Sequence, residues 1–286
     1  MKYTNEMNLP LSLVSAITND DYTMGSADIS VTTLIQPPKI RVLSSRHRDE
    51  ITEDVADCIY RLVGSNTHYI LERIENKNAL QEERINLEVN GWVVSGKADL
   101  YENKTVYDYK NTSVWAVLNG AKPEWASQLN CYAHGYRAMG FPVEGLAIIA
   151  ILRDWSKFKA GQGNYPAKQV VTLPIDLWSD AKAQTYIEDR VLLHQAAESL
   201  SDDDIPICTP EERWERPTKF AVVKGQNKGA WRVVDTLEEA EKLKAQIEES
   251  SGNEYRIDER PGESVRCMNY CSCRDYCNFY QQLVPF

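Results

Sequence analysis

Two aspartates and a lysine, Asp99, Asp108 and Lys110, lie close together in one stretch of the sequence, residues 85–113. Asp108 and Lys110 are two residues apart, so on a strand their side chains lie on the same face. Two carboxylates and an ammonium on neighbouring strands suit a divalent metal ion with a charged group beside it. A D-x-K triplet also arises by chance, and the pair could equally be a solvated ion pair of little energetic value.

Three short strands are predicted to position these side chains, over residues 85–89, 92–100 and 105–110. Asn90-Gly91 marks the first corner, because this dipeptide favours a two-residue hairpin turn. Residues 102–104 mark the second corner. Asp99 then falls near the end of the middle strand, beside the strand that carries the D-x-K triplet.

A helical segment is predicted on the N-terminal side of these strands, over residues 53–75, from its apolar spacing. Residues 64–66 (Gly-Ser-Asn) interrupt the pattern, so either two helices or one kinked helix fits. His68 follows on a helix that is otherwise suited to packing. A single histidine in such a place is more often a hydrogen-bonded core residue than a ligand.

A second helix is predicted on the C-terminal side, over residues 123–139, with Pro123 in its first turn. Gln128 and Tyr132 are four residues apart and share one face of this helix. Alone, that face is an ordinary polar edge.

Four short motifs follow one another along the chain: G-x-x-x-H-x-x-L-E, G-x-x-D, D-x-K and Q-x-x-x-Y. Their residues are Gly64, His68, Leu71 and Glu72; Gly96 and Asp99; Asp108 and Lys110; and Gln128 and Tyr132. In this order and spacing, over residues 45–199, the chain resembles the RecB-like branch of the PD-(D/E)XK nucleases, which includes CRISPR-associated RecB-like exonucleases. The resemblance implies an α/β (α+β) fold with a restriction-endonuclease-like αβββαβ core and a mixed central sheet.

The resemblance also implies roles for these residues. Asp99, Asp108, the Tyr109 carbonyl and His68 would bind Mg²⁺ or Mn²⁺, and the imidazole ligand favours tolerance of Mn²⁺. Lys110 would orient the attacking water, help to deprotonate it and stabilise charge on the phosphorane. Gln128 and Tyr132 would position the scissile phosphate or the water. No covalent enzyme intermediate is required.

The composition agrees with an intracellular globular enzyme. The chain has 286 residues and is 43% hydrophobic, enough for one substantial core and a smaller subdomain. No apolar run reaches the length of a membrane span and no signal peptide is apparent, so we expect a cytoplasmic protein without a membrane partner. The net charge of −10 argues against a general DNA coat but leaves room for a local basic groove. Candidates for that groove are Arg41, Arg46, Arg48, Arg153, Lys157 and Lys159.

The remaining segments complete a domain plan. Strands are predicted over residues 143–153 and 169–173 and a helix over 177–193, before the acidic linker at 201–204. The plan is a lead-in over residues 1–44, a nuclease core over 45–200, a small ββαβ insert over 201–265 and a Cys-rich tail, packed on the core, over 266–286. The lead-in resembles that of phage-encoded members of the same branch, which implies a phage or prophage source and a host-cytoplasm location.

Seven cysteines occur without a secretory signal, so a disulfide framework is not expected. Four of them crowd the C-terminal end, which is typical of a metal site. Cys271 and Cys273 are too close in sequence to serve easily as a pair, so we expect Cys267, Cys271 and Cys277 to act together with the distant Cys208. Cys58 and Cys131 are predicted to be core residues.

RecB-like relatives often hold an iron–sulfur cluster with one distant cysteine and a C-terminal trio. The trio Cys267, Cys271 and Cys277 is one residue longer in its first gap than that pattern. The distant cysteine of those relatives would fall near residues 36–38, where this chain has none. We expect a [4Fe–4S] cluster at this site, with Zn²⁺ as the alternative and a structural role in either case.

These observations favour a divalent-metal-dependent DNA exonuclease that acts on single-stranded DNA or duplex ends, in recombination, repair or phage DNA processing. A recombination or replication protein is a further expected partner. The alternatives are a structure-specific endonuclease with the same core, and a non-catalytic DNA- or protein-binding module that keeps the nuclease fold.

Overall fold

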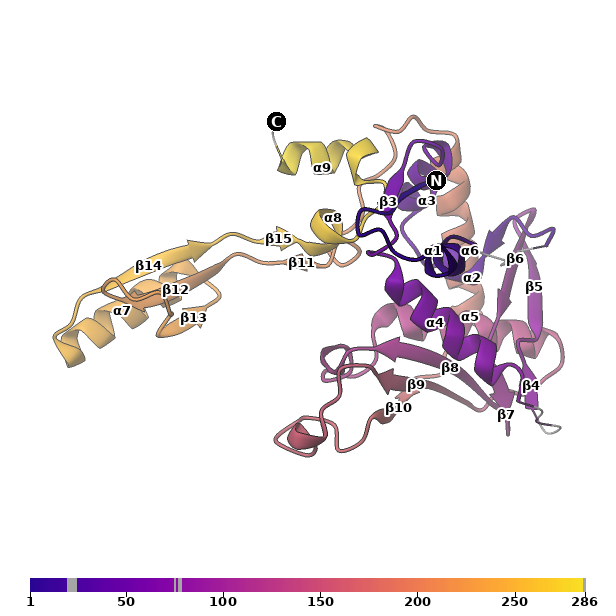
Figure 1. Cartoon of the computed structure of the whole chain (residues 1–286), viewed down its shortest axis with the longest axis horizontal. Coiled ribbons are helices and arrows are strands. Elements are labelled where there is room, and N and C mark those ends of the chain that lie inside the picture. Colours follow the sequence, from indigo (N-terminus) through magenta and orange to yellow (C-terminus); the bar gives the residue numbers. More distant parts are fainter. Residues whose placement is uncertain (20–24, 75, 77–78, 285–286) are drawn as a thin grey trace. The chain divides into compact units, whose positions relative to one another are not determined.

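The computed structural model describes residues 1–19, 25–74, 76 and 79–284 (Figure 1). The chain divides into two compact units, Met1–Ser201 and Asp202–Phe286. The predicted end of the first helical segment, Glu75, lies outside the described residues. Among the helices that the structure describes, none has the length and apolar character needed to cross a membrane.

The first unit is a mixed α/β structure with two main sheets. In the larger sheet β8 and β9 are parallel and the other neighbours antiparallel, in the order β10-β9-β8-β7-β4; the smaller sheet has the order β2-β6-β5. This arrangement confirms the α+β class. The strands are β2 (Ile29–Ser30), β4 (Ala79–Gln81), β5 (Arg84–Val89), β6 (Trp92–Lys97), β7 (Leu100–Glu102), β8 (Thr105–Thr112), β9 (Gly145–Leu152) and β10 (Val170–Ile175).

Both predicted corners are two-residue turns of the kind that hairpins prefer. Asn90 and Gly91 have φ values of 49° and 79°, and Asn103 and Lys104 have φ values of 49° and 61°. Two successive positive φ values are typical of a type I′ turn, whose twist matches that of the flanking strands. Each turn fixes the pairing register of its hairpin, β5–β6 and β7–β8.

The predicted strand over residues 92–100 is wrong in one respect, because it is two strands. β6 ends at Lys97, the chain bends at Ala98 and Asp99, and β7 begins at Leu100 in the other sheet. The Asp99 side chain accepts a hydrogen bond from the Tyr109 backbone N–H at 2.6 Å, which gives that N–H a partner at the bend. Asp99 therefore lies where the two sheets meet.

The predicted helix over residues 53–75 is shorter than expected. Helix α4 (Ile59–Leu71) runs through Gly64 without interruption, whereas β3 (Thr52–Asp54) pairs in parallel with β1 (Lys2–Thr4). The Asp54 carboxylate accepts a hydrogen bond from the Ala56 backbone N–H at 2.9 Å. This bond forms a turn after β3, where the sequence pattern predicted the first turn of a helix. The amphipathic pattern could not reveal this, because strand β3 depends on a partner about fifty residues away in the sequence.

Two helices cover opposite faces of β8. Asn111 hydrogen-bonds the Val63 carbonyl of α4 at 3.3 Å, and Lys110 hydrogen-bonds Gln128 of α5 (Pro123–Ala138) at 3.0 Å. Adjacent strand residues point to opposite faces, so α4 and α5 lie on different sides of the sheet. The helix predicted over residues 123–139 is confirmed.

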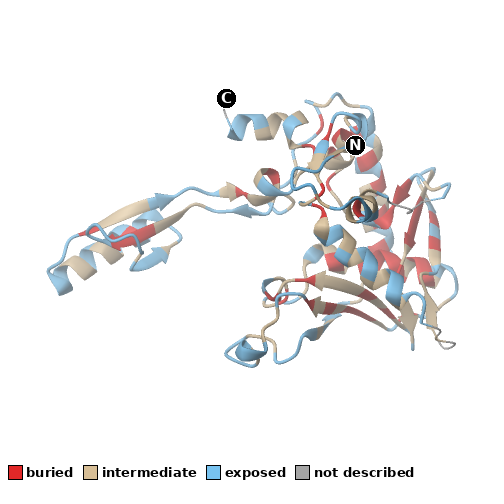
Figure 2. Ribbon diagram, in the orientation of Figure 1, coloured by how far each residue is buried: buried red, intermediate tan, exposed pale blue. Residues whose placement is uncertain are grey.

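The core of the first unit lies on the α5 side of the strands (Figure 2). Leu129 and Tyr136 of α5 pack there with Ile148 and Leu152 of β9, and all four are fully buried. By contrast, α4 has no buried residue. Cys58 and Cys131 are buried, as predicted.

The remaining helices of the first unit pack around this core. Val31 and Leu34 of α2 belong to it, as does Val191 of α6. Residues 1–44 thus contribute core side chains to the same compact unit. The helices are α1 (Leu11–Thr18), α2 (Val31–Leu34), α3 (Pro38–Arg46) and α6 (Asp180–Glu198), with short 3₁₀ turns η1 (Val114–Ala116) and η2 (Lys157–Lys159).

The second unit contains the ββαβ segment and the cysteine-rich tail. The antiparallel sheet β13-β12-β14 packs on α7 through Val222, Ala240 and Tyr255, and a capping box between Thr236 and Glu239 starts that helix. Its elements are β11 (Glu215–Arg216), β12 (Lys219–Lys224), β13 (Arg232–Val234), α7 (Leu237–Ser251), β14 (Tyr255–Arg260), β15 (Glu263–Ser264), α8 (Val265–Asn269), η3 (Arg274–Tyr276) and α9 (Asn278–Leu283).

A buried histidine joins α6 to the N-terminal helices. Arg41 Nε donates to His194 Nδ1 at 2.9 Å, and His194 Nε2 donates to the Leu34 carbonyl at 3.0 Å. One ring nitrogen accepts and the other donates, so the imidazole is neutral. Burial lowers the pKa of His194 to about 4.

Acid should destabilise the first unit through His194. The unfolded histidine takes up a proton below its ordinary pKa of 6.5, whereas the folded one stays neutral down to about 4. Between these values the unfolded state binds more protons, so the free energy of unfolding falls by up to about 1.4 kcal/mol per pH unit as the pH drops. We expect His194→Gln to reduce this slope in urea unfolding, followed by tryptophan fluorescence from pH 7 to pH 4. An identical slope in the variant would contradict the role given to His194.

Candidate active site

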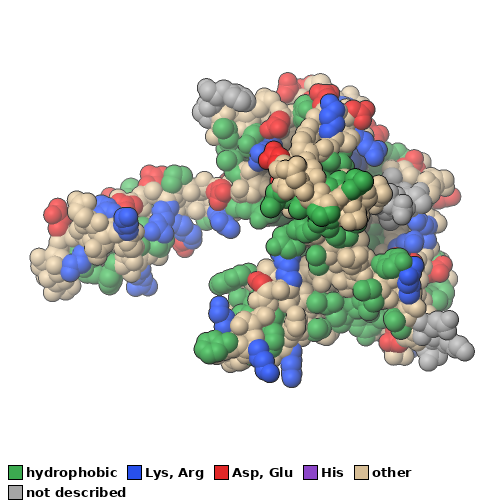
Figure 3. All heavy atoms as spheres, viewed as in Figure 1, with side chains coloured by type: hydrophobic (Ala, Val, Ile, Leu, Met, Phe, Trp, Pro, Cys, Tyr) green, Lys and Arg blue, Asp and Glu red, His purple; other side chains and the backbone are tan. Residues whose placement is uncertain are grey.

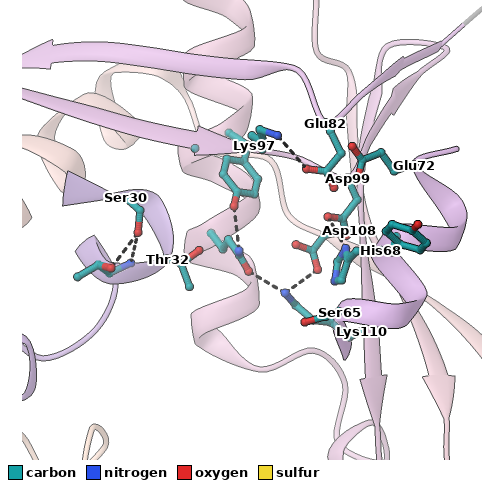
Figure 4. Close-up of a pocket in the computed structure, with 15 residues that line it drawn as sticks. Ser30, Thr32, Ser65, His68, Glu72, Glu82, Lys97, Asp99, Asp108 and Lys110 are labelled. Carbon is teal, nitrogen blue, oxygen red and sulfur yellow. Dashed lines mark hydrogen bonds and ion pairs between the residues drawn. The ribbon is translucent and has the colours of Figure 1, made fainter. Parts of the chain in front are cut away.

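The predicted site residues of the first unit gather around one cavity of about 630 Å³ (Figure 4). His68, Asp99, Asp108, Lys110, Gln128 and Tyr132 all line it. They come from α4, from the bend before β7, from β8 and from α5. The cavity is also lined by Ser30, Thr32, Thr33, Ser65, Tyr69, Glu72, Glu82, Gly96 and Lys97.

The first hairpin places Glu82 opposite Asp99. Arg84 and Lys97 are the last paired residues of β5 and β6, and continuing that register by two residues brings Glu82 opposite Asp99. The Glu82 backbone N–H donates to the Asp99 carbonyl at 3.4 Å, so the pairing does continue. Opposite residues of an antiparallel pair carry their side chains on the same face.

The second hairpin places Asp108 on the other side of Asp99. Leu100 and Tyr107 are paired in β7 and β8, and one residue further the same register sets Asp99 opposite Asp108. Two hairpin registers thus set three carboxylates, from Glu82, Asp99 and Asp108, in a row across the junction of the sheets (Figure 4).

Asp99 holds the centre of the row through both of its carboxylate oxygens. Oδ1 lies 3.1 Å from His68 Nδ1, and Oδ2 accepts the Tyr109 backbone N–H at 2.6 Å. The His68 side chain is 37% exposed, so it is not a packed core histidine, and its role as a metal ligand stays a prediction. Tyr109 meets the site through this N–H, and its carbonyl as a metal ligand stays a prediction.

Lys110 connects the carboxylate row to α5. Its Nζ lies 2.7 Å from Asp108 Oδ2 and donates to Gln128 Oε1 at 3.0 Å. Gln128 Nε2 in turn donates to the Tyr132 hydroxyl at 3.0 Å. The side chains of Asp108, Gln128 and Tyr132 are nearly inaccessible to solvent, so this chain of contacts fixes the ammonium at the cavity wall.

Electrostatics of the row are dominated by burial and by the closeness of like charges. Burial raises the pKa of Asp108, Lys110 opposes that rise, and Asp99 adds to it. Burial and then Asp99 raise the pKa of Glu82 to about 7. The hydrogen bond that His68 donates to Asp99 raises the pKa of His68. Positive charge in the cavity is therefore favoured, and full ionisation of all three carboxylates is disfavoured without it.

One group of potential metal ligands stands out. Among the described residues, His68, Glu82 and Asp99 each offer a ligand atom, and these three atoms lie within 4.8 Å of one another. Asp108 stands outside this group and is engaged with Lys110. The structure therefore brings together every predicted site residue of the first unit and adds Glu82.

Sequence reasoning missed Glu82, although a signal was present. The Asn90-Gly91 turn fixes the β5–β6 register, and extending it from Val89 and Trp92 leads to Glu82 opposite Asp99. The sequence Gln81-Glu82-Glu83 instead has the composition of a solvated turn. The hydroxyl-bearing wall of Ser30, Thr32 and Thr33 carried no comparable signal, because it comes from residues about seventy positions upstream of D-x-K.

The Gly96 position of the G-x-x-D motif has a steric cause. A β-carbon at Gly96 would lie 2.6 Å from Tyr132 Cε1 and 2.9 Å from Val31 Cγ2. The absence of a side chain at Gly96 lets Tyr132 of α5 and Val31 of α2 approach β6 closely.

Two of the predicted groove cations have other partners. Arg41 bonds His194 and pairs with Glu198 Oε1 at 2.7 Å, and Arg46 donates to the Glu198 carbonyl at 2.9 Å. They join α3 to α6, and neither lines the cavity.

Figure 3 shows hydrophobic side chains over α1 and α4, where Leu11, Tyr60, Tyr69 and Ile70 are exposed.

Five cysteines gather in the second unit, and all are free thiols. The segment that follows Cys208 is joined to α8, which carries Cys267, by a backbone hydrogen bond from Arg266 N–H to the Arg213 carbonyl at 3.0 Å. Cys271 Sγ lies 3.6 Å from Cys273 Sγ. Among the residues that the structure describes, no three of these thiols form a close group of potential metal ligands.

These thiols affect one another electrostatically. Burial, Glu212, Cys271 and Cys277 raise the pKa of Cys208 to about 12. Burial and the same two cysteines raise the pKa of Cys267, and the contact with Cys273 together with burial raises that of Cys271. The raised pKa values favour the neutral thiol at Cys208, Cys267 and Cys271.

Comparisons with known proteins add little to this geometry. No family model matches the chain, and no curated protein matches it either. A solved structure entitled "Crystal structure of SSO0001" is similar with a TM-score of 0.40 and 19% identity, over 63% of this chain and 82% of that one. A match at this level carries no argument about function.

Substitution of Gly96 tests the close packing behind the cavity. Gly96→Ala forces Tyr132 or Val31 to move, so we expect a loss of about 1–3 kcal/mol in the free energy of unfolding, measured with urea. Gly64→Ala is the matched control, because a β-carbon there meets nothing within 4 Å. Alanine favours a helix over glycine by up to about 1 kcal/mol, so the control should be neutral or stabilised. Equal stability of both variants and wild type would contradict the steric argument.

Proposed function

We propose that this protein is a divalent-metal-dependent deoxyribonuclease of the RecB-like PD-(D/E)XK branch, acting as an exonuclease. The observation that carries the proposal is the Lys110 ammonium, held by Asp108 and Gln128 at the wall of a cavity that His68 and Asp99 also line. In this family such a lysine beside a carboxylate pair serves phosphodiester hydrolysis. The α5 helix, the two hairpins and the parallel β8–β9 pair support a restriction-endonuclease-like αβββαβ core.

The donor set fits a hard divalent ion. His68 supplies imidazole, and Asp99 and Asp108 supply carboxylate oxygens, with the Tyr109 carbonyl as a further oxygen. Asp108 Oδ2 is buried beside Lys110 and receives no hydrogen bond of regular geometry from the described residues. A bound Mg²⁺ or Mn²⁺ would supply Lewis-acid polarisation of a phosphate oxygen and of a nearby water.

Lys110, Gln128 and Tyr132 are the protein groups proposed to act beside the metal ion. Lys110 is placed to hold the attacking water and to offset the negative charge that builds on the phosphorus centre. Gln128 accepts from Lys110 and donates to Tyr132, so this pair positions the ammonium. Contact of Gln128 or Tyr132 with the phosphate stays a prediction.

For the second unit we propose a structural metal centre held by Cys208, Cys267, Cys271 and Cys277. A [4Fe–4S] cluster and Zn²⁺ both remain candidates, because each is held by four thiolates. The raised pKa values of Cys208, Cys267 and Cys271 fit this role, since a bound cation would offset the charge that thiolates gain there.

DNA is the proposed partner, as single strands or duplex ends, in phage or bacterial recombination, repair or DNA processing in the cytoplasm. The net charge of −10 leaves phosphate attraction to local cations and to bound metal. Lys157 and Lys159 in η2, on the β9–β10 connection, are basic residues suited to that task.

Substitution of the D-x-K residues tests the enzyme. Asp108→Asn and Lys110→Ala should each reduce cleavage of end-labelled linear single-stranded DNA in Mg²⁺ or Mn²⁺ by about 100-fold or more, because each removes a group at the reacting phosphate. Asp49→Asn is the control, since that side chain is fully exposed. Circular single-stranded DNA is run in parallel.

Cleavage of the linear substrate alone supports the exonuclease, and cleavage of the circle supports the endonuclease alternative. If neither is cut in any metal, or if Asp108→Asn cuts as wild type does, the enzyme proposal is wrong and a non-catalytic DNA- or protein-binding module takes its place.

Metal analysis tests the cysteine centre. Anaerobically purified protein should contain iron and absorb in the blue if the centre is [4Fe–4S], or contain zinc without colour. Cys208→Ser should lose that metal and lower the unfolding midpoint of the second unit, whereas Cys58→Ala, in the first unit, should retain it. Protein with neither metal, or loss that is equal in both variants, would rule the centre out.

A further inference from the structure

Glu82 has no satisfying partner among the described residues. Its side chain is 19% exposed, and the nearest cation, Lys97 Nζ, is 3.9 Å from Oε2, at the outer limit of an ion pair. No described residue donates a hydrogen bond to its carboxylate. Burying a carboxylate without such bonds costs free energy, so an ordinary surface ion pair does not account for the position.

The backbone holds Glu82 at this position through strand pairing and an unusual backbone conformation. The β5–β6 register sets it opposite Asp99, and its own N–H bonds the Asp99 carbonyl at 3.4 Å. Its φ of 51° lies in the left-handed region, which glutamate seldom adopts. This conformation directs the carboxylate toward Asp99 and into the cavity (Figure 4).

Geometry places Glu82 with His68 and Asp99 as a further ligand of the proposed ion. The ligand atoms of His68, Glu82 and Asp99 lie within 4.8 Å of one another, a spacing that one cation can bridge with small side-chain rotations. Asp108 Oδ2 instead lies 2.7 Å from Lys110 Nζ. Glu82 thus adds a third carboxylate to the two already proposed as ligands, those of Asp99 and Asp108.

We propose that Glu82 is a protein ligand of the divalent cation, together with His68 and Asp99. This inference rests on the proposed function and deepens it. One nitrogen and two carboxylate oxygens from three separate elements then hold the ion on one side of Asp99. Asp108 on the other side holds Lys110, so that the metal and the ammonium act on the phosphate from neighbouring positions.

Mn²⁺ binding to the full-length protein, measured by the EPR signal of the free ion and by calorimetry, tests this without reference to cleavage. Glu82→Gln keeps the shape of the side chain and removes its charge, and we expect it to weaken Mn²⁺ binding by about tenfold or more. Glu83→Gln is the matched control, because this neighbour is exposed and outside the ligand group, and it should bind as wild type does. Mn²⁺ prefers oxygen and nitrogen ligands, so the cysteine centre does not compete.

Two further variants make every outcome decisive. Asp99→Asn should abolish binding, and Glu82→Asp, which keeps the charge, should bind more tightly than Glu82→Gln if the carboxylate is a ligand. Wild-type affinity in Glu82→Gln, with loss in Asp99→Asn, overturns the role of Glu82 and leaves the proposed function standing. Absence of Mn²⁺ binding to wild type overturns both. Circular dichroism of each variant confirms that the fold is retained.

Discussion

Repulsion among three carboxylates is the constraint on which the first unit's site depends. Two hairpin registers set Glu82, Asp99 and Asp108 in one row where solvent is largely excluded. Like charges at this spacing in a medium of reduced dielectric disfavour full ionisation. The neighbouring basic groups offset this repulsion unequally. The nitrogen–oxygen distance is 2.7 Å from Lys110 to Asp108 and 3.1 Å from His68 to Asp99, but 3.9 Å from Lys97 to Glu82. A deficit of positive charge therefore remains on the Glu82 side of the row.

Contacts elsewhere in the first unit prevent the three carboxylates from moving apart. The bend at Ala98 and Asp99 could open if the sheets slid apart, but Tyr109 bonds Asp99 and the turn at Asn103-Lys104 fixes the register. On the far side, close approach of α5 at Gly96 brings Gln128 and Tyr132 to Lys110. Packing and main-chain hydrogen bonds formed elsewhere in the unit thus keep the three carboxylates close together in the folded state despite their repulsion.

Local signals predicted much of this arrangement. Asn90-Gly91 and residues 102–104 predicted the hairpins because turn geometry is encoded by the turn residues themselves, and the spacing of Gln128 and Tyr132 predicted a shared face. Strand β3 was missed because it depends on a partner distant in sequence, Lys2–Thr4. The break at Ala98 was missed because the bend is held by a hydrogen bond from Tyr109 to Asp99, which the alternation of side chains along a strand does not reveal. Glu82 lay within reach of the same register argument, but the charged run around it had the composition of a surface turn.

The first unit brings carboxylates together and the second contains several thiols, and burial affects the charge of these two kinds of group differently. In the first, carboxylates are held close by strand register, and burial raises the pKa of Glu82 to about 7, so charge is still present at neutral pH. In the second, burial and neighbouring thiols raise the pKa of Cys208 to about 12, so these groups stay neutral until a cation displaces their protons. Oxygen donors select hard ions such as Mg²⁺ and Mn²⁺, whereas thiolates select zinc or iron–sulfur centres. The two proposed centres therefore differ in donor type, and the thiol set is the less suited of the two to Mg²⁺ and Mn²⁺.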